Sequence, residues 1–558
     1  MSKQLIAKAA VVISVWALAL AVTTGWAEQV AGEQGHIKAY GRAEPKVIAR
    51  GAPIHGANGL RFDREGRLHV ASVLGDEILV MDPETGDVIS TIGVNAGVVG
   101  PDDIAFGPDG SLYWTSFSTG EVGRISPDGT RTGQFVRPGV NGIAFSPDGR
   151  LFVTVVFMGD ALYELDPQLV SAPRLIAEKM GFLNGIDWGP GGYIYGPIWN
   201  KGEVVKVNVF SGEITPVATG LNIPAAVKMG PDGKIYVVEQ ATGRVQRIDP
   251  ATGEKQVAAS LAPGLDNLAF DAEGRLFVSH GQDGCVYEVL ADGTARPVCG
   301  SGMIAPGGVA VLARPAETAW VADFWTLRAF DGATGKQKRC LRHIIGVPGG
   351  ITSPFTVSAD GTNLILTSHL PKDMVQVFDL ETGTVLEEYT DLDEPLNAIR
   401  FQGDIVVAER GPARVVRIPA NEPRKRVTLA KGLAAPAGLA AAGDDLWVAD
   451  WATGRVLQLV AGGKSLGKPR TVASGLSYPE GLAVDRDGSL LVVEPEIGKL
   501  DRIDVATGEV RTVAEGFTPC LQDDHPTWIF NGVAVGPSGA IYLTSDVDNL
   551  LYRIDPAP

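Results

Sequence analysis

The sequence predicts an all-β fold built from repeated four-stranded antiparallel units, and three observations lead to this prediction. An apolar residue that opens a short strand recurs about every 42 residues through most of the chain. Turn tripeptides such as Pro-Asp-Gly and Ala-Thr-Gly separate short runs of β-branched and aromatic residues within each repeat. We find no amphipathic helical pattern of useful length in the sequence.

Two segments illustrate the repeat. Val140–Thr154 reads VNGIAFSPDGRLFVT, and Phe530–Thr544 reads FNGVAVGPSGAIYLT. Each places an Asn-Gly pair before a short apolar strand, which is followed by a tight turn and a second apolar strand. Segments such as RVQRID and KQVAAS then supply a third and a fourth strand. Four antiparallel strands in roughly 40 to 50 residues are typical of one blade of a β-propeller.

Twelve such blades can be recognised. The apolar residues that open them are Leu60, Ile104, Ile143, Ile186, Val227, Leu268, Val309, Phe355, Ile399, Leu439, Leu482 and Val533. Because propellers typically carry about four to eight blades, twelve are too many for one common ring. The simplest division is two tandem six-bladed β-propellers, formed by residues 45–291 and 292–558.

The ends of the chain suggest how each ring closes. Lys46–Gly51 resembles a lone fourth strand, and we expect it to complete the blade at Asn267–Leu290. Thr294–Gly300 would then complete the last blade, Gly532–Asp555, whose fourth strand is missing. Closure of this kind removes free sheet edges and places the boundary near Ala291. The alternative is a split arrangement, with one ring inserted into the other and Lys46–Gly51 closing on the C-terminal blade.

Residues 1–27 have the features of a signal peptide. Lys3 and Lys8 give a positive start, Ala9–Val22 is apolar, and small residues precede the expected cleavage. The apolar run is short for a bilayer span, although an uncleaved anchor is an alternative. We therefore expect a periplasmic or secreted protein with an N-terminal lead at 28–44 and no membrane span after signal removal.

Composition narrows the classes of partner. The chain has 558 residues, of which 45% are hydrophobic and 20% charged, and its formal net charge is −17. Binding nucleic acid requires a basic surface, so this charge argues against that partner and gives no support to binding of anionic lipid. The expected partner is a small-molecule substrate or a periplasmic protein.

The chain contains four cysteines, and an oxidising compartment permits disulfides between them. They are Cys285, Cys299, Cys340 and Cys520. Four cysteines allow three pairings, between which the sequence does not choose. No Cys-x-x-Cys motif is present, which removes the haem-attachment and zinc-ribbon interpretations.

Polar side chains recur two residues before the apolar residue that opens each blade, where they should meet at one end of the ring channel, here called the mouth. In the first ring these residues are Asn58, Asp102, Asn141, Asn184, Ala225 and Asp266. In the second ring they are Gly307, Ser353, Asn397, Ala437, Glu480 and Asn531. Carboxylate and carboxamide oxygens suit a hard divalent cation, with Ca²⁺ expected first and Mg²⁺ or Mn²⁺ as alternatives.

The predicted cation ligands are drawn from both mouths. They are Asp102, Asn141, Asn184 and Asp266 in the first ring and Asn397 and Asn531 in the second. A structural interpretation competes with this one, because an Asn side chain before a strand often caps backbone amides.

Candidate catalytic groups come from the mouth and from the end of the second strand of each blade. They are Glu480, Glu239, His369 and His280, which could transfer protons if their surroundings shift their pKa values. Acidic residues recur at the second-strand end, as at Asp323, Glu409, Asp450 and Glu494. That recurrence favours a hydrogen bond that ties a loop in each blade.

One loop near the second mouth is unusually long. Phe517–Phe530 carries Asp523, Asp524, His525 and Trp528. Two interpretations of this loop stay open: a lid over a pocket, and a surface patch that binds a partner. No G-x-S-x-G elbow, H-E-x-x-H motif or glycine-rich phosphate loop occurs in the sequence.

The repeats resemble known families. IYVVEQATGRVQRID, LWVADWATGRVLQLV and LLVVEPEIGKLDRID look like NHL repeats. VNGIAFSPDGRLFVT and YPEGLAVDRDGSLLVVE are similar to the gluconolactonase and senescence-marker-protein superfamily of six-bladed propellers. That resemblance implies a divalent ion, often Ca²⁺, held in the channel by a Glu, Asn, Asn, Asp set, and hydrolysis of lactones or related esters.

Carried over residue by residue, the resemblance covers part of that set in each ring. Asn141 and Asn184 resemble the two Asn residues, and Asp102 or Asp266 stands for the Asp. The first ring has no Glu at this position, whereas the second ring has Glu480 but no Asp.

The expected function is therefore a divalent-metal-dependent hydrolase of lactones or related esters at a propeller mouth. A non-catalytic periplasmic binding or scaffold protein of NHL type is the alternative from another class. A lyase on the same scaffold is a third.

Overall fold

The computed structural model describes residues 37–313, 316–518 and 530–557, and these ranges consist of strands joined by turns. Helical segments in them are limited to three-residue 3₁₀ turns. These are η2 (Val94–Ala96), η3 (Pro190–Gly192), η4 (Trp451–Thr453) and η5 (Pro495–Ile497). None of the helices in the described ranges is long and apolar enough to span a bilayer. The proposed signal peptide, residues 1–27, lies outside these ranges.

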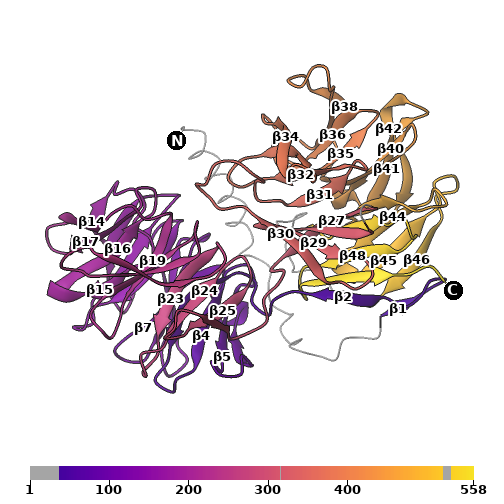
Figure 1. Ribbon diagram of the computed structural model, residues 1–558. Helices are drawn as coiled ribbons and strands as arrows, with labels where there is room; N and C mark the ends of the chain where they lie inside the picture. Colours follow the sequence, from indigo (N-terminus) through magenta and orange to yellow (C-terminus); the bar gives the residue numbers. More distant parts are fainter. Residues whose placement is uncertain (1–36, 314–315, 519–529, 558) are drawn as a thin grey trace. The chain divides into compact units, whose positions relative to one another are not determined.

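The described residues form twelve antiparallel sheets in two compact units, as predicted. Unit 1 is Ala52–Gly302, and the described part of unit 2 is Ile37–Gly51 together with residues from Met303 to Ala557. Each unit contains six sheets, and each sheet places its first strand innermost. Figure 1 shows unit 1 in indigo to magenta and most of unit 2 in orange to yellow.

Unit 1 is a closed ring in which every blade uses four consecutive strands. The blades are β3 (Ala57–Phe62), β4 (Leu68–Ser72), β5 (Glu77–Met81), β6 (Val88–Ile92); β7 (Pro101–Phe106), β8 (Leu112–Ser116), β9 (Glu121–Ile125), β10 (Arg131–Phe135); β11 (Val140–Phe145), β12 (Leu151–Val155), β13 (Ala161–Leu165), β14 (Arg174–Glu178); β15 (Asp187–Gly189), β16 (Tyr193–Ile198), β17 (Glu203–Asn208), β18 (Ile214–Ala218); β19 (Pro224–Met229), β20 (Ile235–Glu239), β21 (Arg244–Ile248), β22 (Lys255–Ser260); and β23 (Leu265–Phe270), β24 (Leu276–His280), β25 (Cys285–Val289), β26 (Ala295–Pro297). Each inner strand contacts the next, and β23 returns to β3, which closes the ring.

Unit 2 is a second closed ring, whose inner strands run from β27 to β47 and back to β27. Its blades are β27 (Pro306–Leu312), β28 (Thr318–Asp323), β29 (Thr326–Asp331), β30 (Gln337–Arg342); β31 (Thr356–Ala359), β32 (Asn363–Ser368), β33 (Met374–Asp379), β34 (Thr384–Tyr389); β35 (Pro395–Phe401), β36 (Asp404–Glu409), β37 (Arg414–Ile418), β38 (Val427–Lys431); β39 (Pro436–Ala442), β40 (Asp445–Asp450), β41 (Arg455–Ala461), β42 (Lys464–Ser474); β43 (Leu482–Val484), β44 (Leu490–Glu494), β45 (Lys499–Ile503), β46 (Val510–Glu515), with β1 (Lys38–Ala39) at its edge; and β47 (Val533–Val535), β48 (Ile541–Ser545), β49 (Leu550–Ile554), β2 (Lys46–Arg50).

The strand that closes unit 2 comes from the start of the described chain, and this differs from the expected pairing. β2 pairs antiparallel with β49, with Lys46 opposite Arg553, whereas we expected it to pair with the blade at Asn267–Leu290. Figure 1 shows the dark β2 beside the yellow C-terminal strands. The blade at Asn267–Leu290 is completed by β26 instead, because the tight turn at Asp292-Gly293 folds it directly onto β25. The observed closure is the split arrangement that we weighed as the alternative.

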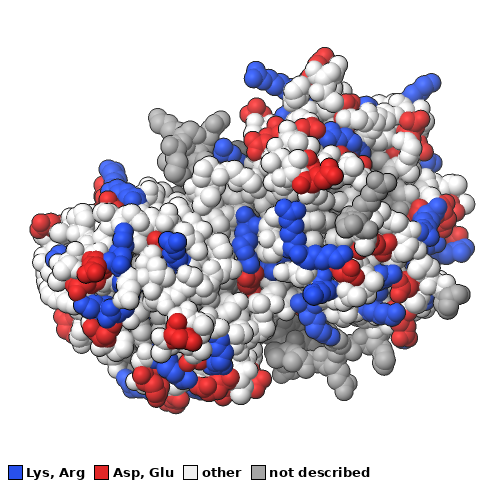
Figure 2. Space-filling view, in the orientation of Figure 1, with Lys and Arg blue, Asp and Glu red and all other residues white. Residues whose placement is uncertain are grey.

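The hydrophobic core lies between neighbouring blades. The second strands β4, β8, β12 and β24 are buried along their whole length because a blade packs on each face. The outer strand β10 alternates between exposed and half-buried residues. Figure 2 shows acidic and basic side chains interspersed over the visible surface of both units. The buried second strands therefore give the ends of each ring a rigid base on which polar residues can be positioned.

Candidate functional site

The mouth of unit 1 contains the predicted polar residues in equivalent positions. A β-bulge in the inner strand, such as that between Pro101 and Ile104, precedes the opening apolar residue in several blades. Five of the six mouth positions carry side-chain oxygens: Asn58, Asp102, Asn141, Asn184 and Asp266. Asp102 and Asp266 belong to the two blades on either side of the β3–β6 blade, and their carboxylates are close enough to interact electrostatically.

Hydroxyl groups from the second strands fix the backbone at this mouth, a feature that the sequence analysis missed. The Thr115 hydroxyl accepts the N–H of Asp103 at 3.0 Å and donates to the carbonyl of Asn141 in the next blade. Thr154 does the same, with its hydroxyl 2.9 Å from the N–H of Gly142 and 3.3 Å from the carbonyl of Asn184. We call this pair of hydrogen bonds, which joins one blade to the next, a clasp. The sequence signal for it is a hydroxyl residue that recurs one position before the end of the second strand.

The side chains of the four predicted ligands in unit 1 have no hydrogen-bond partner among the described residues. Asp102, Asn141 and Asn184 are only 7–8% exposed, and Asp266 is half-buried. Burial, followed by the charges of Asp266 and Asp103, raises the pKa of Asp102 well above its usual range. Burial and the charge of Asp103 raise the pKa of Asp266 to about 7. Two carboxylates thus interact with each other without a donor or a cation from the chain.

The groups next to this mouth are, in contrast, well bonded. Asp103 accepts the N–H groups of Ile104 at 2.9 Å and Ile143 at 3.2 Å, and the Asn267 amide donates to it at 3.1 Å. Lys228 is buried and donates to the carbonyl of Ile186 at 3.1 Å. Burial is the main reason why the pKa of Lys228 is lowered to about 8. These residues connect blades to one another. The mouth side chains, in contrast, have oxygens that accept no hydrogen bond from the described residues.

The side chains at the mouth of unit 1 carry the oxygen ligands that a hard cation prefers. Across the described ranges, no group of three or more His, Cys, Asp or Glu side chains is arranged to hold a metal. A cation at this mouth would therefore use two carboxylates, Asp102 and Asp266, together with the carboxamide oxygens of Asn141 and Asn184. Two carboxylates balance a divalent charge, and Ca²⁺ accepts both kinds of oxygen.

The mouth of unit 2 differs from the prediction in register. Pro395 pairs with Glu409 and Ala398 with Val407, which are the positions that Pro101 and Ile104 hold in unit 1. Leu396 therefore occupies the mouth position, and Asn397 lies one residue deeper. There its Oδ1 accepts the N–H of Leu439 at 3.3 Å, as Asp103 accepts that of Ile143. The structure thus gives Asn397 a contact between blades, because the small Ala398, rather than Ile399, opens the strand.

The same correction applies to the β31–β34 blade. The Thr367 hydroxyl accepts the N–H of Thr356 at 3.2 Å and contacts the carbonyl of Leu396, which repeats the clasp of Thr115. This register puts Phe355, and not Ser353, at the mouth. Phe355, Leu396 and Ala437 are all buried, so much of this mouth is apolar.

Glu480 and Asn531 are brought together in unit 2, but they bind each other. The carboxylate of Glu480, which is 3% exposed, accepts the backbone N–H of Asn531 at 2.8 Å and its side-chain amide at 3.2 Å. Burial raises the pKa of Glu480 to about 8; the hydrogen bonds from Asn531 oppose this rise and the charge of Asp546 adds to it.

Glu239 and His280 are buried at the ends of second strands in unit 1. Glu239 accepts the N–H of Asn222 at 3.0 Å and the hydroxyl of Thr242 at 2.6 Å, which ties a loop. His280 accepts the N–H of Asp283 at Nδ1, 3.2 Å away, and its Nε2 lies 3.4 Å from the Asp283 carboxylate. These contacts hold loops around the mouth, and the catalytic roles of both residues stay predictions.

His369 lies in unit 2, one residue beyond the end of β32. Its Nδ1 is 3.3 Å from the Asp373 carboxylate, and its ring packs edge-on against Phe355 with centroids 4.4 Å apart. The recurring acids at the second-strand ends tie loops, as expected: Asp450, for example, accepts the N–H of Ala435 at 2.7 Å. The long loop with Asp523, Asp524, His525 and Trp528 falls outside the described residues.

Comparison with known proteins gives one short family match. A family model described as strictosidine synthase-like, N-terminal, matches residues 88–125, which run from β6 to β9 and include Asp102. No curated protein matches the chain.

Many solved structures match the chain at low sequence identity. A streptogramin B lyase structure is 16% identical over 51% of this chain and 96% of its own, with a TM-score of 0.38. A proposed gluconolactonase is 15% identical over 46% of this chain and 93% of its own, with a TM-score of 0.36. The extracellular domain of a proposed one-component system from B. thetaiotaomicron is 12% identical over 94% and 83%, with a TM-score of 0.33. The predicted resemblance to six-bladed propellers is confirmed for the fold by the two rings themselves.

Proposed function

We propose that this double propeller is exported, binds a divalent cation at the mouth of unit 1, with Ca²⁺ as the first candidate, and hydrolyses lactones or related esters there. One observation carries the proposal: Asp102, Asn141, Asn184 and Asp266 present oxygens at one end of the ring, and no described residue donates a hydrogen bond to them. Oxygens that receive no hydrogen bond from the chain remain available as ligands for a hard cation.

Each ligand in this proposal has its own role. Asp102 and Asp266 supply two negative charges, and a bound cation would offset the repulsion between them. Asn141 and Asn184 supply neutral oxygens, and the clasps from Thr115 and Thr154 hold their backbones in place. A bound divalent cation supplies Lewis acidity toward the carbonyl oxygen of an ester.

The choice of unit 1 rests on the contrast with unit 2. Glu480, which the sequence singled out as a catalytic base, uses its carboxylate to hold Asn531. Asn397 bonds to the backbone of the next blade. In unit 1 the corresponding oxygens accept no hydrogen bond from the described residues, so they are available to bind a cation.

The test begins with cation binding by the purified full-length chain. We expect metal analysis and calorimetry to show one tight divalent site, which is lost in Asp102→Asn and Asp266→Asn and retained in Glu480→Gln as the matched control. A panel of lactones and aryl esters should then be hydrolysed, with activity removed by a chelator and restored by Ca²⁺, Mg²⁺ or Mn²⁺. Cation binding without turnover of any ester would support the non-catalytic alternative, and absence of cation binding would contradict the proposal.

A further inference from the structure

Two turns on one side of the β15–β18 blade depart from the repeat. The turn between the first two strands reads GPGGY at Gly189–Tyr193, whereas the next blade reads GPDGK at Gly230–Lys234. Gly and Tyr thus replace the acid and the base of the usual turn. In the turn after β17, Phe210 stands where the next blade has Ala251. Phe210 is 79% exposed.

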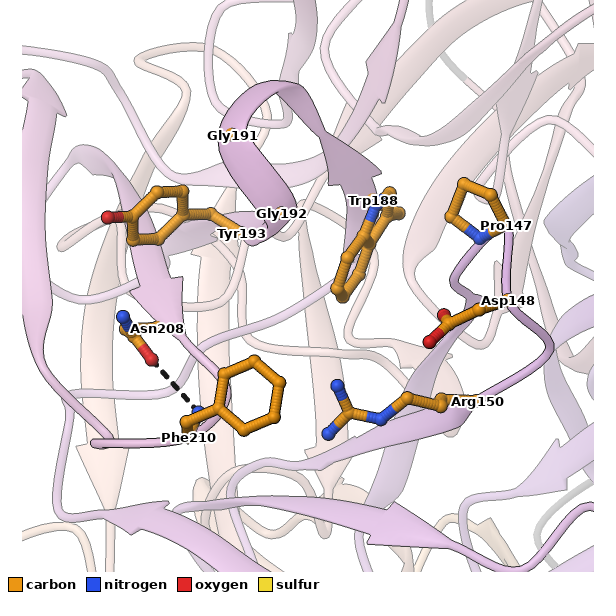
Figure 3. Close-up of a pocket in the computed structure, with 9 residues that line it drawn as sticks. All are labelled: Pro147, Asp148, Arg150, Trp188, Gly191, Gly192, Tyr193, Asn208 and Phe210. Atoms are coloured by element: carbon orange, nitrogen blue, oxygen red, sulfur yellow. Dashed lines mark hydrogen bonds between the residues drawn. The ribbon is translucent and has the colours of Figure 1, made fainter.

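These departures create a pocket with aromatic walls and a volume of about 370 Å³. Figure 3 shows Trp188, Tyr193 and Phe210 around the space, with Arg150 and Asp148 contributed by the preceding blade. Trp188 is held by stacking on Phe152, with ring centroids 5.6 Å apart. A Cβ at Gly191 would lie 3.1 Å from the ring of Tyr193, so glycine at this position leaves that ring uncovered.

The charged groups at this pocket are Arg150, Asp148 and Lys206, whose ammonium lies 5.1 Å from the centroid of the Tyr193 ring. Arg150 donates to both carboxylate oxygens of Glu164, at 2.7 and 3.0 Å, and its guanidinium lies 4.7 Å from the centroid of Phe210. Within the described part of the chain, the Tyr193 hydroxyl and the Trp188 indole N–H have no hydrogen-bond partner. The pocket thus combines flat apolar faces with free donors and acceptors.

We propose that this pocket binds a neutral saccharide. The C–H face of a sugar ring can pack against Phe210 or Trp188, while its hydroxyls bond to Tyr193 and Asp148. An anionic ligand would meet the carboxylate of Asp148 beside Arg150, whose guanidinium is already bound to Glu164. A wholly apolar ligand would leave the polar groups unpaired, which disfavours its binding.

The test uses the full-length chain with three neutral probes: maltotriose, cellotriose and chitotriose. We expect at least one to saturate with a Kd of about 1 mM, measured by calorimetry and by tryptophan fluorescence. Phe210→Ala should weaken that binding at least about tenfold, whereas Phe135→Ala, which removes another exposed aromatic of unit 1, should not. Failure of all three probes to bind, or equal binding by Phe210→Ala, would overturn the proposal.

A separate observation concerns Cys285 and Cys299 in the last blade of unit 1. Their Sγ atoms are 3.6 Å apart, and the Cys285 thiol points at the backbone carbonyl of Cys299, 2.8 Å away. Cys285 lies in β25, and Cys299 follows β26, just before unit 1 ends at Gly302. Unit 1 closes without an exchanged strand, and β26 pairs with β25 over only three residues, Ala295–Pro297.

The geometry points to a Cys285–Cys299 disulfide as a covalent modification of the exported protein. In the reaction each thiol loses its proton, one S–S bond forms, and the two electrons pass to a disulfide of an oxidant, which is reduced to two thiols. The bond closes a short loop and fastens β26 where the chain leaves unit 1. This pairing is one of the three that the cysteine count alone left open.

Peptide mass mapping of the protein from an oxidising compartment, without reductant, tests this pairing. We expect one cross-linked peptide that joins Cys285 to Cys299, which persists in Cys340→Ser. Reductant should lower the Tm of the wild type but leave that of Cys285→Ser and Cys299→Ser unchanged. Free thiols at both positions, or a cross-link from either one to Cys340 or Cys520, would contradict the proposal.

Discussion

The mouths of units 1 and 2 share blade architecture and register but differ in what their side chains bind. In unit 1 five of the six positions carry oxygens, and four of these are the side chains of Asp102, Asn141, Asn184 and Asp266. In unit 2 the corresponding positions include Phe355, Leu396 and Ala437, which are buried and apolar. The difference shows that the scaffold sets where a side chain is presented, while single residues decide whether that end of the ring can bind.

Glu480 and Asn531 make the same point within unit 2. Both were candidate functional residues from the sequence, yet their polar atoms bond to each other. A residue type that suits a cation is therefore insufficient evidence of a site. The informative property is whether its oxygens already have donors, and in unit 1 they do not.

The largest expected effect comes from removing charge at the mouth of unit 1. Asp102→Asn and Asp266→Asn should each weaken Ca²⁺ binding by about 100-fold, because a divalent charge would then face one carboxylate. Glu480→Gln in unit 2 should leave the affinity unchanged. Calorimetry on the three variants checks this, and equal losses in both units would remove the contrast between the two mouths.

A smaller effect is expected from the threonine clasps, which both units use. Thr154→Val removes the hydroxyl that bonds to Gly142 and Asn184, and Thr544→Val removes its counterpart at Gly532 and Gly307. Each change leaves buried backbone groups unsatisfied and should lower the free energy of unfolding by about 1–3 kcal/mol. Denaturant unfolding measures the loss.

Thr154→Val should also weaken Ca²⁺ binding, because Asn184 is a proposed ligand, whereas Thr544→Val should not. If both variants lost stability but neither lost affinity, the clasp would have no part in shaping the cation site.

The last expected effect is a dependence of the free energy of unfolding on pH that arises in unit 2. Burial raises the pKa of Glu480 from 4.5 to about 8, so the folded state binds this proton more tightly than the unfolded state. The resulting stability is fully present below pH 4.5 and is lost as the pH rises toward 8. Glu480→Gln should flatten this part of the Tm profile, and an unchanged profile in that variant would argue that Glu480 is ionised in the folded protein.

Much of the fold could be predicted because the repeat is local. Turn residues such as those of Ser146–Gly149 and the apolar runs beside them define one blade without reference to distant residues. Ring closure is non-local: Lys46–Arg50 has the pattern of any outer strand, so the sequence could not choose between its two candidate partners. The structure pairs it with β49.

The candidate site was predicted in part for a related reason. Asn141 and Asn184 precede clear apolar strand openings, so their mouth positions followed from the pattern. Asn397 was displaced by one residue because Ala398 is a weak apolar signal beside Ile399. The bonding of Glu480 to Asn531 links positions 51 residues apart, which no local pattern reveals.

The exchange of β2 into the C-terminal blade has a consequence for how the protein is made. Synthesis releases β2 before all of unit 1, yet its partner β49 emerges only after unit 1 and the other blades of unit 2. All of unit 1 can fold in the interval, because its six blades come from one continuous stretch. A nascent or truncated chain that lacks the final blade therefore carries a finished first ring beside an open second one, whose bare strand edges invite aggregation or proteolysis.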